Sequence, residues 1–431
     1  MNDYLTSITP DGISGALFAL EGVAGSVVLL NGPTGCRYYH SGISERQILR
    51  QKQFDPLNFN ERFFFGQSRI PSTFLDSGDY IYGGRDKLVE GLEYIKEKLP
   101  NHKLLAIVNT PGAALIGDDL EGIVNNVFSD IDAVLLETPG YSTDICAGFE
   151  TGALALLETL NPQKKPVVDK TVNLLGLSLF QKYFKGDLAE LKRLLGLCGI
   201  KVNCALCAGS SIEEIMDIGA AALNIVVRHE YGIRAAKYLE DTLGTAYMLC
   251  DGPPIGFGPT EDFVVDICAR LGADPGPALE DCGRARAAAY MHVWRLASSV
   301  GLPRGARVAV EGTYSEIYAY FKFFIGYFGM LPQAACVFCP EMDGMRHKTE
   351  ELLAAHGLSG LLGRDIMSDG ESELVFASGA TISRLVGAGF RFVGVENALP
   401  SMGYVDVIDK THLGVAGSML IVEQVLNGLL F

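Results

Sequence analysis

The chain has 431 residues, of which 48% are hydrophobic, and it carries a formal net charge of −16 at pH 7. A chain of this length can bury more than one core, so two or three domains are expected. No cluster of Lys or Arg stands out from the acidic background. Because nucleic-acid binding needs a basic patch, the composition argues against a nucleic-acid partner.

Neither an export signal nor a membrane span is expected. Residues 1–4 are not a positive segment leading into an apolar run, and the longest apolar stretches, such as residues 27–30, are too short to cross a bilayer. We therefore expect a cytoplasmic protein with no membrane partner. Its ten cysteines are expected to be reduced thiols or metal ligands rather than a disulfide framework.

Short runs of Val, Ile, Leu and Ala end in Gly, Pro, Ser or Asp turns and lead into amphipathic stretches. This alternation predicts βαβ units and parallel sheets. The predicted strands are residues 26–30, 103–108, 133–136, 171–177, 202–208, 221–227, 307–311, 333–336, 373–377 and 390–395. That is too many strands for one ordinary doubly wound domain, so we predict three Rossmann-like α/β domains with mostly parallel sheets.

Domain boundaries are predicted near residues 164 and 302, where Pro or Gly occurs with Lys or Arg, as in surface connections. The first domain then covers residues 1–164, the second 165–302 and the third 303–396. Residues 397–431 contain a glycine-rich motif at 413–417 and a predicted final helix at 418–429. We expect this segment to pack back on the first domain.

Cys36 is the first candidate ligand. In sheets of this kind, ligands bind outside the carboxyl ends of the strands, and Cys36 follows the first strand in the sequence Gly-Pro-Thr-Gly-Cys. The preceding Gly35 allows a close backbone approach, and the thiolate of Cys36 could hold iron. A buried structural thiol is the alternative, since Cys is among the most buried residue types.

Further motifs follow in a fixed order. An aromatic residue precedes Gly83-Gly84, then come Ile116-Gly117-Asp118-Asp119, a Thr-Pro-Gly-Tyr at residues 138–141 and the glycine-rich motif near the end. Together with Cys36, this order and spacing resembles the nitrogenase component 1 family over essentially the whole chain. The family includes the two chains of the molybdenum–iron protein, cofactor-assembly scaffolds, dark-operating tetrapyrrole reductases and methylthio-alkane reductases.

The resemblance implies an iron–sulfur cluster, 4Fe–4S or larger, between two related chains, held by cysteines of the first domain. Cys36 matches one of those cysteines, whereas Asp11 and Pro111 stand at the positions of the other two. Asp11 could bind iron through its carboxylate or could cap a helix beginning at Gly12. Pro111 cannot be a ligand, so a six-cysteine cluster shared by two copies of this chain is excluded. Cys36, Gly35 and Asp11 are therefore the cofactor-binding candidates, with Cys36 and Asp11 as metal ligands.

The resemblance also implies a second site, a cavity among the domains where catalytic chains anchor a large cofactor on a cysteine. Arg228 stands at that position here, and Arg has no lone pair to offer. The chain thus resembles the non-catalytic, β-type chain, or it uses the cavity differently. His412 could face this cavity.

Three remaining features carry cysteines or carboxylates. Two Cys-x-x-Cys pairs, Cys204–Cys207 and Cys336–Cys339, have a spacing that suits metal, but their apolar flanks favour buried thiols. Cys146 could lie near the cluster, although packing is the expected role. Asp118 and Asp119 are expected to cap and position the helix that follows them.

The sequence therefore predicts a β-type subunit of a nitrogenase-like two-component reductase. The expected partners are a related α-type chain, in an α2β2 heterotetramer, and a separate ATP-dependent iron–sulfur reductase. ATP would bind only to that partner, because this chain has no Gly-x-x-x-x-Gly-Lys-Ser/Thr loop. The substrate stays open among a thioether, a tetrapyrrole and dinitrogen. The alternatives are a scaffold for metallocofactor assembly, a subunit of a tetrapyrrole reductase, and a purely structural partner.

Overall fold

The computed structural model describes residues 10–36, 70–99, 101–128, 131–137, 143–341, 344–399 and 406–430. The Thr-Pro-Gly-Tyr motif at residues 138–141 lies outside these ranges. Within them, no helix combines the length and the apolar character that crossing a membrane requires.

The described strands form three sheets, and every strand pair in them is parallel. The first has the order β1 (Ser26–Asn31), β2 (Leu104–Asn109), β3 (Asp132–Leu136). The second has the order β5 (Lys201–Ala205), β4 (Val168–Leu175), β6 (Ala221–Val226), β7 (Tyr247–Leu249). The third has the order β11 (Val393–Glu396), β10 (Leu374–Ala377), β8 (Arg307–Gly312), β9 (Leu331–Val337). The predicted α/β class with parallel sheets is confirmed.

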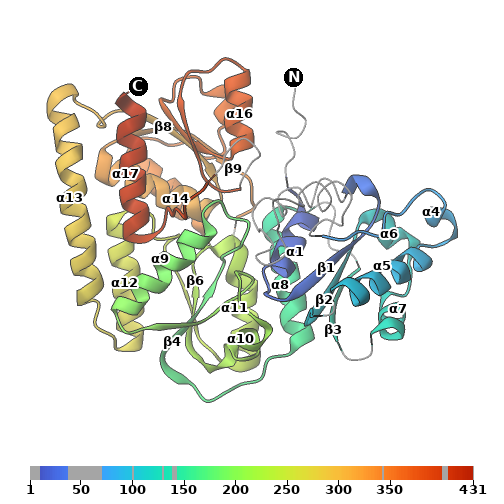
Figure 1. Ribbon diagram of the computed structural model, residues 1–431. Coiled ribbons are helices and arrows are strands. Elements are labelled where there is room, and N and C mark those ends of the chain that lie inside the picture. The colour runs from blue at the N-terminus through green and yellow to red at the C-terminus, as the bar shows by residue number, and fades with distance from the viewer. Residues whose placement is uncertain are drawn as a thin grey trace.

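Helices cover both faces of the first and second sheets (Figure 1). Those of the first domain are α1 (Gly12–Glu21), α4 (Asp79–Tyr82), α5 (Arg85–Lys98), α6 (Pro111–Ile116), α7 (Leu120–Val127) and α8 (Ile145–Leu160). Those that accompany the second sheet are α9 (Phe184–Leu197), α10 (Ile212–Met216), η3 (Ile218–Ala220), α11 (His229–Leu243), α12 (Phe257–Leu271) and α13 (Gly276–Val300). The rest are α14 (Tyr314–Phe323), η4 (Phe324–Phe328), α15 (Met345–Ala355), η5 (Ile366–Ser368), α16 (Gly379–Gly387) and α17 (Gly414–Leu430).

The sheets share their cores rather than standing apart. One apolar cluster joins α1 and α8 of the first domain to α11 and the neighbouring face of the second sheet. A second cluster joins α9, α12 and α13 to α14, α17 and the third sheet. Such continuous burial of apolar surface favours one fixed arrangement of the three units. Each sheet's strands fall inside one predicted domain, and the boundaries near residues 164 and 302 remain a proposal.

The last helix does not lie where the sequence analysis expects it. α17 contacts α9, α12, α13 and the strands β10 and β11, and in Figure 1 it runs beside α13, away from the first sheet. Its start is tied to α9, because Glu190 accepts from the backbone N–H groups of Val415 and Ala416 at 2.9 and 3.1 Å. The expectation that residues 397–431 pack back on the first domain is therefore wrong for this helix.

Glycines bring α1 and α8 into backbone contact. A Cβ atom added at Gly148 would lie 1.9 Å from the carbonyl oxygen of Gly12, and one at Gly15 would lie 2.0 Å from that of Ile145. The two helices run side by side with their first residues adjacent, since Asp11 and Asp144 form an isolated β-bridge just before them. The close packing thus places two helix N-termini at one end of the first domain.

Gly148→Ala should separate α1 from α8 and lower the free energy of unfolding by at least about 2 kcal/mol, because the added methyl group meets backbone and not a side chain that could rotate away. Gly196→Ala is the matched control. Gly196 lies on the exposed face of α9 with open space at its Cβ position, so alanine there should raise stability by about 0.5 to 1 kcal/mol. Denaturant unfolding followed by circular dichroism measures both; equal effects of the two substitutions would contradict the packing argument.

Candidate functional site

Buried amides shape the turn that leads to Cys36. β1 and β2 pair with Asn31 opposite Asn109, and the side chain of Asn31 donates to that of Asn109 at 2.9 Å. Thr73 donates to Asn31 at 2.8 Å and accepts from the backbone N–H of Gly32 at 2.9 Å. Because these polar groups are buried and mutually satisfied, they fix the carboxyl ends of both strands.

Cys36 lies at the carboxyl end of the first sheet, as predicted, in a helical turn that covers residues 34–36. It is half-buried, and burial followed by the negative charge of Asp11 raises the pKa of its thiol. The glycines before it differ in their packing. A Cβ at Gly32 would collide with Thr110, whereas one at Gly35 would meet open space. Packing among the described residues therefore accounts for Gly32 but not for Gly35.

Asp11 is the N-cap of α1, which confirms the capping interpretation. Its Oδ1 accepts from the backbone N–H of Ser14 at 3.0 Å and from the Ser14 hydroxyl at 3.1 Å. Asp11 is also close enough to Cys36 to act on its titration. That Asp11 binds a metal remains a prediction. An Asp11 that bound a metal would also have to keep its capping hydrogen bonds to Ser14.

The other motifs of the first domain that lie in the described residues are structural. Pro111 occupies the first turn of α6, whose N-cap is Thr110. Asp119 caps α7 through a bond from the Gly122 N–H at 3.0 Å, and Asp118 accepts from the Gly84 N–H at 2.9 Å. The expectation that both aspartates cap and position the helix that follows them is confirmed for Asp119 only, because Asp118 bonds to the residue before α5 instead.

Exposed apolar side chains lie on α4 and α6, two helices that contact each other. Ile81, Tyr82 and Leu115 are 73%, 89% and 88% exposed. Tyr80 links them to the cysteine, because it packs over Gly112 and its phenol and the Cys36 thiol interact electrostatically. Isolated exposed apolar residues are ordinary, but a contiguous group is typical of an interaction surface.

The described residues of this region fit part of a cluster site. Cys36 supplies one thiol, and Asp11 supplies a carboxylate already used as a cap. An iron–sulfur cluster is usually held by four thiolates. The donor set therefore suits a cluster that another chain completes, with Cys36 as this chain's ligand.

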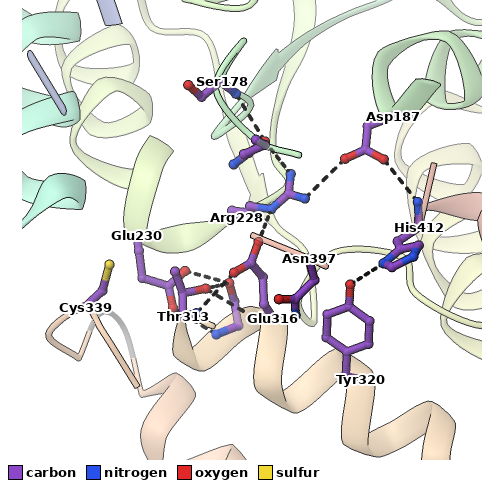
Figure 2. Close-up of polar contacts among 12 residues, drawn as sticks. Ser178, Asp187, Arg228, Glu230, Thr313, Glu316, Tyr320, Cys339, Asn397 and His412 are labelled. Atoms are coloured by element: carbon purple, nitrogen blue, oxygen red, sulfur yellow. Dashed lines mark hydrogen bonds and ion pairs between the residues drawn. The ribbon is translucent and has the colours of Figure 1, made fainter. Parts of the chain in front are cut away.

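A second group of polar residues lies where the second and third sheets meet (Figure 2). Arg228, which follows β6, is buried and donates from Nε to Glu316 at 2.8 Å, from one terminal nitrogen to Gln181 at 2.8 Å and from the other to Asp187 at 3.3 Å. Burial works against the guanidinium charge, but Glu316 and Asp187 outweigh it and raise the pKa of Arg228. We call these four residues the Arg228 network.

The Arg228 network is anchored on both sides. Glu316 also accepts from the backbone N–H of Thr313 at 3.1 Å, completing a capping box at the start of α14. Glu230, two residues after Arg228, accepts from the backbone N–H and hydroxyl of Ser315 at 2.9 and 2.6 Å. The start of α11 is thereby bonded to the start of α14. The nitrogens of Arg228 are all donors, so the side chain has no lone pair with which to anchor a metal.

His412 joins the C-terminal segment to this region, next to the Arg228 network as Figure 2 shows. Its Nδ1 pairs with the Tyr320 hydroxyl at 2.6 Å and its Nε2 with Gln424 at 2.9 Å, while Asp187 accepts from its backbone N–H at 3.3 Å. Burial lowers the pKa of His412 to about 3. His412 therefore lies at the junction of the domains, as the sequence analysis suggested, but as a neutral, fully bonded side chain.

The predictions about the two Cys-x-x-Cys pairs and about Cys146 have different outcomes. Cys204 and Cys207 are buried free thiols, and burial raises the pKa of Cys204 to about 12, as expected of packed residues. Cys336 and Cys339 do not converge, because Cys336 packs in a cluster with the third sheet and Cys339 in the cluster of α1 and α8. Cys339 is instead joined to Cys146 as a disulfide. The expectation that all cysteines are reduced thiols or metal ligands is thus wrong for this pair.

Sequence reasoning missed this pairing because the two cysteines belong to different motifs, 193 residues apart. It also gave no role to Asp187, Glu230 or Glu316. The only signal for them was their position just after strands or at helix starts, which many surface carboxylates share.

The fold is that of a multidomain α/β protein with three parallel sheets and ligand-type residues at their carboxyl ends. One of these residues, Cys36, could supply part of the ligand set of an iron–sulfur cluster. A family model described as nitrogenase component 1 type oxidoreductase matches residues 12–429. The chain belongs to this family of oxidoreductases, and the resemblance seen in the sequence is confirmed.

Individual relatives are distant. The chain is 25% identical over 246 residues to a light-independent protochlorophyllide reductase chain of Angiopteris evecta, covering 55% of this chain and 45% of the relative. It is 23% identical over 296 residues to the nitrogenase vanadium-iron protein beta chain of Trichormus variabilis, covering 61% and 58%. The matches thus span about half the length of these relatives.

Solved structures show the same fold. The structure described as nitrogenase Cp1 at pH 6.5 superposes with a TM-score of 0.76 over 98% of this chain and 92% of that one, at 18% identity. The structure at pH 5 gives a TM-score of 0.71 over 98% and 88%, at 20% identity.

Arg228→Met should lower the free energy of unfolding by about 3 to 5 kcal/mol, because it leaves Asp187 and Glu316 buried without their cation. Arg284→Met is the control, since Arg284 pairs with Glu280 and Asp281 on the surface of α13 and its loss should cost less than about 1 kcal/mol. Urea unfolding compares the two. Similar midpoints for both variants would show that the Arg228 network does not hold the domains together.

Protonation of His412 opposes folding, because its pKa lies near 3 in the folded chain against a reference of 6.5. The unfolded chain then binds the extra proton at pH values between these two. Above pH 6.5, His412 is neutral in both states and does not lower the free energy of unfolding. Below pH 6.5, its titration lowers the free energy of unfolding by about 1.4 kcal/mol for each pH unit. His412→Gln removes the titration, so its unfolding free energy should fall less steeply on acidification than that of the wild type. Parallel pH profiles for the two proteins would refute the assignment.

Proposed function

We propose that this chain is the β-type subunit of a nitrogenase-like two-component reductase. It receives low-potential electrons from a separate ATP-dependent iron–sulfur protein through a cluster that it shares with a related chain. The observation that carries the proposal is the position of Cys36, a single thiol at the carboxyl end of the first sheet.

A shared cluster follows from the number of ligands. The described residues around Cys36 offer one thiol, and four thiolates are the usual set. The exposed group Tyr80, Ile81, Tyr82 and Leu115 gives a surface beside Cys36 against which the related chain would pack. The proposed assembly is therefore an α2β2 heterotetramer with the cluster, 4Fe–4S or larger, at the subunit interface. Asp11 is proposed as a further oxygen ligand.

The β-type role rests on Arg228. The guanidinium takes the position at which the resemblance implies a cysteine anchor, and all its bonds are made to protein acceptors. A large metallocofactor anchored there would have to displace a buried ion pair. The partner chain is therefore proposed to carry the principal substrate site.

Among the substrates considered from the sequence, a tetrapyrrole gains support from the comparisons, because relatives include chains of light-independent protochlorophyllide reductase. The thioether hypothesis, which would make the chain part of a methylthio-alkane reductase, rests on the sequence resemblance. A role as an assembly scaffold predicts the same Cys36 ligand without substrate turnover.

Cys36→Ala should lower the iron content of the anaerobically purified complex and abolish its turnover, because the cluster loses a thiolate of this chain. Cys198→Ala and Cys282→Ala are matched controls, since both are buried free thiols of the second domain and should cost only about 1 to 2 kcal/mol of packing. Iron analysis with electron paramagnetic resonance gives the readout. If the Cys36 variant keeps its full iron complement and signal, Cys36 is no ligand and the proposal loses its main support.

A further inference from the structure

Three further ligand-type side chains, none of which is Cys36 or Asp11, meet at the start of α8. One ligand atom each from Asp144, Cys146 and Cys339 lies within 4.8 Å of the other two. The two cysteines are 2% and 7% exposed, their Cα atoms are 6.4 Å apart, and they are joined as a disulfide. Two buried sulfurs and a carboxylate brought together from distant parts of a chain form a donor set typical of metal ions in proteins.

The first domain supplies two of these donors in a fixed geometry. Asp144 is the N-cap of α8, and its Oδ1 accepts from the backbone N–H groups of Cys146 and Ala147 at 2.9 and 3.0 Å. Both bonds use Oδ1, so in the described part of the chain Oδ2 is left for another contact. The cap therefore holds the carboxylate at the side of the Cys146 sulfur.

The third domain supplies the other sulfur. Cys339 follows β9 at the carboxyl end of the third sheet and packs in the cluster built on α1, α8 and α11. The second domain closes the site from α11, where Tyr231 stacks edge-on against Phe149 at 5.4 Å and senses the charge of Asp144. In Figure 2 the Cys339 side chain lies on the Glu230 side of the Arg228 network. The donor set thus lies where all three domains meet.

We infer that Asp144, Cys146 and Cys339 form, in the reduced protein, a binding site for a single thiophilic divalent ion such as Zn²⁺ or Fe²⁺. Thiolates select such ions over Mg²⁺ or Ca²⁺, and three protein ligands leave a fourth tetrahedral position for water or a substrate atom.

The chemistry of loading the site balances as follows. Two electrons and two protons convert the disulfide into two thiols, and binding of the divalent ion releases those two protons as the thiolates form. The electrons come from a low-potential iron–sulfur protein of the class proposed above, or in vitro from a dithiol such as dithiothreitol. Metal binding is therefore coupled to the redox state of the Cys146–Cys339 pair.

The test uses Co²⁺ alone as the probe, titrated under anaerobic conditions into the full chain after reduction with dithiothreitol and removal of the reductant. One equivalent should produce thiolate-to-cobalt charge-transfer absorption. Cys146→Ser and Cys339→Ser should lose this band, whereas Cys282→Ser, a buried cysteine of α13, should keep it. Asp144→Asn preserves the cap, since Asn also caps helices, and should bind Co²⁺ at least about tenfold more weakly.

The outcomes separate this site from the cluster proposed at Cys36. Cys36→Ala should retain the cobalt band even though it loses cluster iron, so either claim can fail without the other. The inference is overturned if the reduced wild type shows no thiolate band, or if the two serine variants keep it. It is also overturned if the disulfide resists reduction until the chain unfolds, because the pair is then a structural cross-link.

Discussion

The buried charge of Arg228 is the constraint on which the arrangement of the domains depends. A guanidinium removed from water is stable only with paired, well-placed acceptors, and here these come from segments far apart in the sequence. Gln181 and Asp187 lie after β4, and Glu316 begins α14 beyond β8. The second and third sheets must therefore be set so that their carboxyl ends face each other.

Other features of the fold follow from this setting. Asp187 also accepts from Thr411 and His412, so the segment before α17 is drawn to the same charge and the helix packs on α9 and α13 rather than on the first domain. Glu230 holds the start of α14. The region where the resemblance implies a cofactor cavity is thus occupied, near Arg228, by ionic and hydrogen-bonded protein groups, which is consistent with a β-type role.

The first domain meets the other two through a different interaction, the backbone contact of α1 with α8. Gly12, Gly15 and Gly148 permit that contact, and it sets the caps Asp11 and Asp144 side by side. Asp11 then lies by Cys36, and Asp144 lies by Cys146 and Cys339. The two proposed metal sites, one with Cys36 and one with Asp144, Cys146 and Cys339, therefore both lie beside the start of a single helix pair.

Local sequence patterns predicted those parts of the structure that depend on interactions between residues close together in the sequence. The apolar runs predicted ten of the eleven strands found in the described residues. The strand β7 was missed because its three residues are too few to form a pattern. The Asp11 cap and the exclusion of Pro111 and Arg228 as ligands followed from side-chain chemistry. The Cys146–Cys339 pair, the acceptors of Arg228 and the place of α17 depend on contacts between distant segments, on which neither periodicity nor motif spacing reports.

The central claim is that this chain holds only part of a cluster site and that a related chain completes it. The most direct measurement is anaerobic purification of the chain alone and together with its genomic neighbours, followed by iron and sulfide analysis and light scattering. The account predicts that the chain alone contains little iron and that a heteromeric complex contains a cluster at each pair of chains. A soluble monomer that carries a full cluster by itself would contradict it.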